Sequence, residues 1–330
     1  MRYLNIWNDI HPVTRWKGDE GLMDYLVEAG QSGPIGLMCA EEASIHSVTP
    51  FLTKERFEKF QEVYMVQGGY DIAYYDAILK ELPNLTYEIW PYYFLYESVY
   101  HNNYANVNLD VDKLFLCMNY KPRIHRKKLL DELARVNLLE SNYITWHQPK
   151  ESYHYKPDLF DEDYYDWKYW KPTQTYLEGT TWDQYAPPIE IKKSVINVVT
   201  ESFLHCPFIT EKTWNSITSK KPFIILGNKG IHKHLEKIGF MLPNQIDYSF
   251  DNVEDNDLRI QMIVQELNRL SKINLEQLSN SMEDVVEHNY RKALEIVKTE
   301  KHSANVAGHY KNIIERARRK ANELSYSTGV

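Results

Sequence analysis

A polar segment in the second half of the chain has the residue types and spacing to bind an activated ligand. Glu201 follows the apolar run 194–199, and Thr210-Glu211-Lys212 opens the next predicted helix. In open α/β sheets, ligands bind beyond the carboxyl ends of the strands, where the free N–H groups of helix N-termini attract anions. A carboxylate at this place can bind ribose hydroxyls, and an adjacent ammonium can neutralise a diphosphate. The segment therefore indicates a site for a nucleotide-activated donor.

Helix capping explains only part of this segment. Thr210 is a good N-cap residue, and a carboxylate at Glu211 complements the helix dipole in the first turn. Lys212 is not explained in this way, because a cation near a helix N-terminus is unfavourable unless an anion joins it. We therefore favour the interpretation with a bound diphosphate.

A second basic segment, 119–128, lies between a predicted strand and a predicted helix. It begins with Asn119 and carries two arginines, Arg123 and Arg126, together with three lysines. Arginine binds phosphate through two parallel hydrogen bonds. A solvated basic turn is the alternative, but the position directly after a strand favours an anion site.

Chemistry on a bound donor also needs a general base, which we expect in the N-terminal half of the chain. Glu41 and Glu42 follow the short apolar run 35–39 and precede a polar loop. Asp9 and Asp19 occupy similar positions. Each of these residues is also explained as an ordinary surface carboxylate, so the sequence leaves the choice open.

The segment 151–190 is rich in aromatic residues and lacks helical or strand periodicity. Its rings could line an acceptor site by stacking on sugars or nucleobases, and Trp167 and Trp170 are the candidates. A loop that packs its rings onto the domain explains the same composition equally well.

No metal or other cofactor is expected besides the donor substrate. Three acidic triplets, at 110–112, 161–163 and 255–257, could suggest a divalent cation, but such matches arise often by chance. The histidine and cysteine spacings typical of zinc sites are not found in the sequence.

The predicted elements alternate between strands and helices in both halves of the chain. Apolar runs predict strands at 3–7, 35–39, 86–90, 113–118, 143–146 and 194–199, and another in the run 221–227, where it ends at the glycine. Helical periodicity predicts helices at 19–29, 53–63, 70–82 and 126–138, and a mostly helical segment at 258–324. We expect an α/β protein with two facing Rossmann-like domains, 1–105 on the acceptor side and 106–255 on the nucleotide side. Residues 256–330 would pack back across both. One large doubly wound sheet is the competing architecture.

Length, charge and cysteine content limit the classes of protein to which the chain can belong. The chain has 330 residues and a net charge of -8, so it is long enough for two domains, and whole-chain attraction to nucleic acid is not expected. Its three cysteines are far apart, which fits a reducing cytoplasm. No stretch approaches the roughly 20 apolar residues needed to span a bilayer. We expect a soluble cytoplasmic protein that does not insert into membranes.

The donor segment resembles that of the α1,3-fucosyltransferase-like enzymes. Phe208-Ile209-Thr210-Glu211-Lys212, followed by 221–227, resembles their donor-site signature, and Glu201 matches the carboxylate ahead of it. Asn119 with Arg123 or Arg126 resembles an upstream Ser-Asn…Arg element. Similar sequences occur among viral and phage-type glycosyltransferases, some of which modify hydroxymethylated DNA bases.

Two stretches of the N-terminal half add to the resemblance. Ile89-Trp90-Pro91-Tyr92-Tyr93 resembles the junction between the family's two domains, and Cys39-Ala40-Glu41-Glu42 stands where the family has its catalytic base. The resemblance implies a metal-independent, inverting glycosyltransferase of the two-domain GT-B type.

The resemblance also implies a role for each matched residue. Glu211 would bind the donor ribose, and Lys212 with Arg123 or Arg126 would neutralise the diphosphate leaving group. Glu41 or Glu42 would deprotonate the acceptor hydroxyl, which belongs to a glycan or to hydroxymethylated DNA. If the protein is viral, the reaction would take place in the host cytoplasm. A non-catalytic protein that binds nucleotide sugars or glycans is the alternative from a different class.

Overall fold

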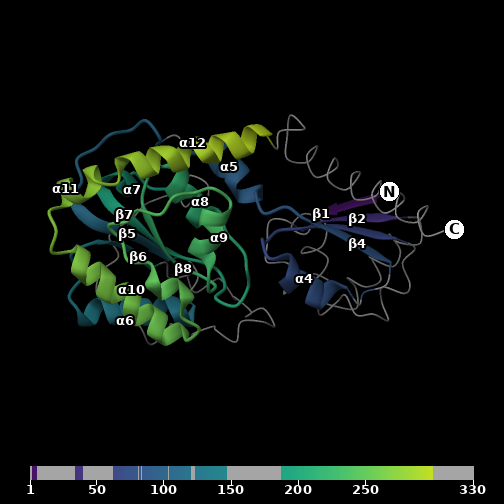
Figure 1. The fold of residues 1–330 in the computed structure, drawn as a ribbon, viewed down its shortest axis with the longest axis horizontal. Helices are drawn as coiled ribbons and strands as arrows, with labels where there is room; N and C mark the ends of the chain where they lie inside the picture. Colours follow the sequence, from purple (N-terminus) through teal and green to yellow (C-terminus); the bar gives the residue numbers. More distant parts are fainter. Residues whose placement is uncertain are drawn as a thin grey trace, which may run out of the picture. The chain divides into compact units, whose positions relative to one another are not determined.

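The computed structural model describes residues 2–5, 34–39, 62–119 apart from 81, 83 and 103, 123–146, and 187–299. These residues form two compact units. The first comprises the described residues up to Tyr93 together with Thr299, and the second is Phe94–Lys298. Each has its own parallel sheet (Figure 1). The prediction of an α/β protein with two parallel sheets is confirmed, whereas the boundaries at 105 and 255 stay predictions.

The sheet of the first unit has the strand order β1-β2-β3-β4, with every neighbouring pair parallel. The strands are β1 (Arg2–Asn5), β2 (Ile35–Cys39), β3 (Val63–Gln67) and β4 (Leu85–Ile89). β3 is buried along its whole length, as expected of a central parallel strand with a continuous apolar run. The predicted helix at 53–63 is therefore wrong at Val63, and its other described residue, Glu62, lies in no helix or strand.

A tight turn joins β3 to α4 (Ile72–Leu79). Asp71 caps this helix by accepting from the backbone N–H groups of Ala73 and Tyr74. Gly69 has a φ of 104°, and a Cβ there would collide with the ring of Tyr75. The turn therefore requires glycine on both counts.

The sheet of the second unit has the strand order β6-β5-β7-β8, again parallel throughout. Its strands are β5 (Lys113–Asn119), β6 (Tyr143–Trp146), β7 (Ser194–Thr200) and β8 (Phe223–Leu226). The chain leaves β5 towards β6 on one side and continues from β7 to β8 on the other. The strand order thus reverses between β5 and β7, which makes the carboxyl ends of these two strands a topological switch point.

Helices cover both faces of this second sheet (Figure 1). α6 (Ile124–Arg135) follows β5 and packs with α10 (Asn256–Leu270) on one face, while α8 (Glu211–Thr218) and α12 (Glu283–Thr299) lie on the other. The remaining elements of the unit are α5 (Tyr93–His101), α7 (Glu190–Lys193), α9 (Ile231–Lys237), α11 (Leu275–Asn280) and a short 3-10 helix, η3 (Ser249–Asn252).

Helical spacing in the sequence produces the core between sheet and helices. Leu129, Leu130 and Leu133 share one face of α6 and are fully buried against β5 and β7. Ile260, Ile263, Val264 and Leu267 do the same for α10. Burial of one such side chain contributes roughly 1.5–3 kcal/mol, so these two helices are held firmly against one face of the sheet.

Most predicted elements of the second unit are confirmed with shifted ends. The helix expected at 126–138 runs over 124–135, and the ends of the strands differ by two residues at most. The mostly helical C-terminal segment is confirmed as far as Thr299, with breaks after α10 and α11. α5 was not predicted, because the proline at 91 reads as a chain break. No helix in the described part of the chain is long and apolar enough to cross a membrane.

Candidate functional site

The predicted donor residues gather at the switch point of the second sheet. Asn119 is the last residue of β5, and Thr200 is the last residue of β7. The hydroxyl of Thr200 donates to Asn119 Oδ1 at 2.9 Å, and both side chains are fully buried. Asn119 Nδ2 donates to the carbonyl of Thr145 on β6 at 3.3 Å. These bonds tie three adjacent strand ends together, so Asn119 fixes the frame on which the site is built.

Glu201 caps the start of α8. Its carboxylate is fully buried and accepts from the backbone N–H of Thr210 at 3.1 Å and from the hydroxyls of Thr210 and Thr213 at 2.6 and 2.7 Å. A buried carboxylate needs such donors, and the positive end of a helix suits it. The structure therefore gives Glu201 three partners within the chain, where the sequence suggested ribose hydroxyls.

Lys212 also has partners in its own helix. Its ammonium lies 2.7 Å from Glu211 Oε1 and donates to the hydroxyl of Thr210 at 3.1 Å. Thr210 Oγ1 in turn accepts from the backbone N–H of Lys212, which completes the N-cap. The charge of Lys212 is thus matched by Glu211, and a bound anion is not needed to explain it.

The start of α6 is built differently. Its N-cap residue is Arg123, which makes no side-chain cap hydrogen bond among the described residues, and no acidic residue stands in its first turn. The first turn instead carries His125, Arg126 and Lys127. Positive charge here opposes the helix dipole. Such a helix start favours an anionic ligand.

Two arginines of this helix start are almost completely buried. Arg126, 2% exposed, donates to the carbonyls of Thr200 and Glu201 at 3.1 and 3.4 Å. The guanidinium of Arg123, 5% exposed, lies 4.8 Å from the ring centroid of Phe203. Burial, with a smaller contribution from Arg123, lowers the pKa of Arg126 to about 10. Arg126 remains charged at neutral pH, and its environment favours a nearby negative charge.

His125 joins this group as a neutral imidazole. It is 2% exposed, and its Nε2 lies 3.0 Å from the carbonyl of Glu201. Burial, and then the charge of Arg126, lower its pKa far below the ordinary value of a histidine. A third buried arginine, Arg259 of α10, acts in the same direction. The sequence interpretation missed His125 and Arg259. The position of His125 beside Arg126 was the one signal available, and Arg259 comes from a distant helix.

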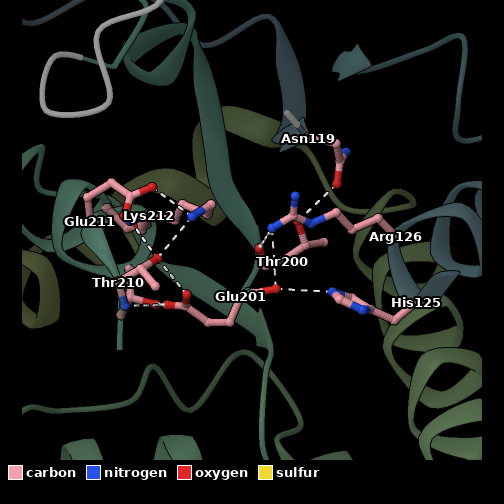
Figure 2. Close-up of polar contacts among 10 residues, drawn as sticks. Asn119, His125, Arg126, Thr200, Glu201, Thr210, Glu211 and Lys212 are labelled. Carbon is pink, nitrogen blue, oxygen red and sulfur yellow. Dashed lines mark hydrogen bonds and ion pairs between the residues drawn. The ribbon is translucent and has the colours of Figure 1, made fainter. Parts of the chain in front are cut away.

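Figure 2 shows how Glu201 joins the two helix starts. Its carboxylate points to Thr210 at the start of α8, and its backbone carbonyl faces His125 and Arg126 at the start of α6. Among the described residues, the surrounding group holds four basic side chains, Arg123, Arg126, Lys212 and Arg259, and two carboxylates, Glu201 and Glu211. The excess positive charge lies on the α6 side.

Four predicted site residues lie outside the described residues. These are the base candidates Glu41 and Glu42 and the acceptor candidates Trp167 and Trp170. Among the residues that the structure does describe, no cluster of three or more histidine, cysteine, aspartate or glutamate side chains could hold a metal ion.

Comparisons with known proteins place few constraints on the chain. No protein-family model matches the sequence, and no curated protein matches it. One similar solved structure is that of the DNA-modifying enzyme β-glucosyltransferase, determined with and without UDP-glucose. It is 10% identical over 90% of this chain and 78% of that chain, with a TM-score of 0.45. A T4 phage BGT mutant in complex with UDP-glucose is 12% identical over 85% and 76%, with a TM-score of 0.40.

Proposed function

We propose that the chain is a glycosyltransferase that moves a sugar from a nucleoside-diphosphate donor to an acceptor hydroxyl. The observation that carries the proposal is the start of α6, basic and without an acidic first-turn residue, at the switch point between β5 and β7. Ligands of open α/β sheets bind at such points, and a diphosphate supplies the negative charge that this helix start favours.

The buried guanidiniums suit a reaction that releases a diphosphate. As the sugar departs, negative charge builds up on the bridging phosphate oxygen. Fixed positive groups in a desolvated setting stabilise that charge more than water does. Arg126 is held by two backbone carbonyls, so its charge is already placed before the donor arrives.

We propose a single displacement with inversion at the anomeric carbon. Glu41 or Glu42 takes the proton of the acceptor hydroxyl while its oxygen forms a bond to the anomeric carbon. The bond from that carbon to the phosphate oxygen breaks, and its electron pair leaves with the nucleoside diphosphate. Glu211 would bind the donor ribose, while Arg123, Arg126 and Lys212 would neutralise the diphosphate. Such a reaction requires no metal.

Glu201, Thr210 and Asn119 have a different part in this proposal. Asn119 accepts from the hydroxyl of Thr200 at the neighbouring strand end, and Glu201 accepts from the backbone N–H and the hydroxyl of Thr210 at the start of α8. We therefore assign them to positioning the two helix starts around the donor. Direct contact of these three residues with the donor, for which the sequence makes them candidates, stays a prediction.

The acceptor is a glycan or a hydroxymethylated DNA base, and Trp167 and Trp170 are proposed to bind it. The similar solved structures are those of a DNA-modifying enzyme and of a complex with UDP-glucose. A DNA acceptor predicts that binding to hydroxymethylated duplex weakens steeply with salt despite the net charge of -8. The cytoplasmic location expected from cysteine usage stays a prediction.

A donor screen tests the proposal. Nucleoside diphosphates and their sugars are added singly, and the melting temperature is recorded, since a ligand stabilises by RT ln(1 + [L]/Kd). We expect one nucleotide class to raise the melting temperature and its sugar to be consumed once an acceptor is present, with EDTA added. Binding without turnover over a broad acceptor panel would favour the non-catalytic alternative. No response to any nucleotide would overturn the proposal.

A further inference from the structure

A cavity of about 280 Å³ opens beside the start of α6. Ile124, His125 and Lys128 line it from α6, Leu204 from the loop after β7, and Asp255 and Ile260 from the start of α10, among others. Ligand pockets usually measure roughly 300–1,000 Å³, so this cavity suits one ring system rather than a whole nucleotide sugar.

One of the residues that line the cavity, His125, carries a buried acceptor atom. His125 Nε2 lies 3.0 Å from the carbonyl of Glu201, an acceptor, so the proton of the neutral ring belongs on Nε2. The low pKa described above keeps the ring neutral. Nδ1 then carries a lone pair, and within the described residues it is buried without a hydrogen-bond partner. A ligand that fills the cavity can donate an N–H to this atom.

The other lining groups select against charged ligands. Leu204 and Ile260 are apolar and buried. Asp255 and Asp257 are exposed and repel phosphate, and the ammonium of Lys128 is paired with Asp257 at 2.6 Å. A metal is not indicated, because the described residues hold no suitable cluster. A flat, neutral ring with a polar edge fits this lining.

The cavity adjoins the proposed diphosphate site. His125 lines the cavity, Arg126 belongs to the phosphate side, and both side chains bond to the carbonyl of Glu201. One ligand can therefore place its anionic end at the start of α6 and its ring in the cavity, because the two places adjoin at the same end of this helix.

We infer that the cavity binds the nucleobase of the donor and selects bases with a ring N–H, which is donated to His125 Nδ1. This inference rests on the proposed function. Uracil, thymine and guanine carry such an N–H beside a carbonyl. The matching ring nitrogens of cytosine and adenine are acceptors, and their lone pairs would face that of Nδ1.

The test is a calorimetric titration of the full chain with UDP, CDP, GDP, ADP and inorganic pyrophosphate. We expect UDP or GDP to bind at least roughly tenfold more tightly than its partner, CDP or ADP, because a mismatched base leaves polar groups unpaired. UDP methylated on its ring nitrogen should bind like CDP if uracil is the preferred base. Equal binding of all nucleotides and pyrophosphate would overturn the inference but leave the diphosphate site standing.

A variant tests the role of His125. In His125→Gln the amide nitrogen can take the place of Nε2 and donate to Glu201, while the acceptor at Nδ1 is lost. We expect the preference between the paired bases to fall to about one, with pyrophosphate binding retained as proof of folding. A preference that survives in this variant, or tighter binding of CDP or ADP, would overturn the inference. No binding of any of the five ligands to the unaltered chain would overturn the proposed function as well.

Discussion

The starts of α6 and α8 follow neighbouring strands of one sheet, yet they differ in how positive charge is balanced. Carboxylates balance it at the start of α8, whereas the first turn of α6 has none. α8 begins with a hydroxyl cap at Thr210, a buried carboxylate at Glu201 and an ion pair between Glu211 and Lys212. α6 begins with Arg123 and has no acidic residue in its first turn. The helix with the recognisable sequence pattern is thus satisfied by its own chain. α6, whose sequence carries no such capping pattern, is the helix whose start favours a ligand.

This contrast separates two uses of a helix N-terminus. Caps and first-turn carboxylates neutralise the dipole and stabilise the fold. A basic start without them stores an electrostatic imbalance that a bound anion relieves. We therefore assign diphosphate binding mainly to α6 and positioning mainly to α8.

The largest expected effect comes from Arg126→Met. Removal of a buried cation from the diphosphate site should weaken binding of UDP and GDP roughly a hundredfold, measured by calorimetry. Arg126→Lys keeps the charge and should recover part of the affinity. Arg135→Met, at the other end of the same helix and in an ion pair with Glu132, is the matched control and should change little. A folded Arg126→Met variant with unaltered affinity would show that the start of α6 does not bind the diphosphate.

Glu201→Gln tests the capping role of α8. The change leaves at least one of the three donors around the carboxylate without its partner, so we expect unfolding to become easier by about 1–2 kcal/mol. Calorimetric melting measures this loss, and Thr213→Val, which removes one donor, should show a smaller one. If Glu201→Gln keeps its melting temperature and loses nucleotide binding, Glu201 is a direct ligand after all.

Lys212→Met should affect affinity less than Arg126→Met does. Because Glu211 already matches its charge, we expect a loss of only about threefold in nucleotide affinity. The same titration serves for both variants. A loss as large as that of Arg126→Met would restore the interpretation in which Thr210-Glu211-Lys212 is the main anion site.

The far end of α8 gives an effect of a different kind, a pH dependence of stability that does not involve the ligand. Lys192 donates to the carbonyl of Ser219, the C-cap of α8, and Lys221 donates to the carbonyls of Lys192 and Ser194. Burial lowers the pKa of Lys192 to about 8 and that of Lys221 to about 7, from an ordinary 10.5.

The direction of this pH dependence follows from proton binding. Between these folded values and 10.5, the unfolded chain binds more protons, so stability rises as pH rises from about 7 towards 10. Melting temperatures across this range check the prediction. Lys221→Met should flatten the rise, and a fall in stability over the same range would contradict it.

Much of the second unit could be predicted from the sequence because its signals are local. The apolar run 194–199 and the spacing of Leu129, Leu130 and Leu133 specify a buried strand and a buried helix face. Thr210 as N-cap of α8 follows from residue type in the same way. In the first unit, β3 was missed because its start at Val63 continues a segment with helical spacing.

The partners of the site residues could not be predicted, because they come from distant parts of the chain. Glu201 was assigned to ribose since nothing local shows that Thr210 and Thr213 fold back onto it. Lys212 seemed to need an external anion, although the neighbouring Glu211 supplies one. Arg259 reaches the site only because α10 packs on α6. Position along the strands was predictable, and side-chain pairing was not.

A crystal structure of the protein soaked with UDP or GDP tests the central claim most directly. The account predicts that the diphosphate lies at the start of α6, with phosphate oxygens within hydrogen-bond distance of the first N–H groups of that helix and the nearest guanidinium from Arg123 or Arg126. A diphosphate held by Lys212 and the start of α8, with none of its oxygens near α6, would contradict it.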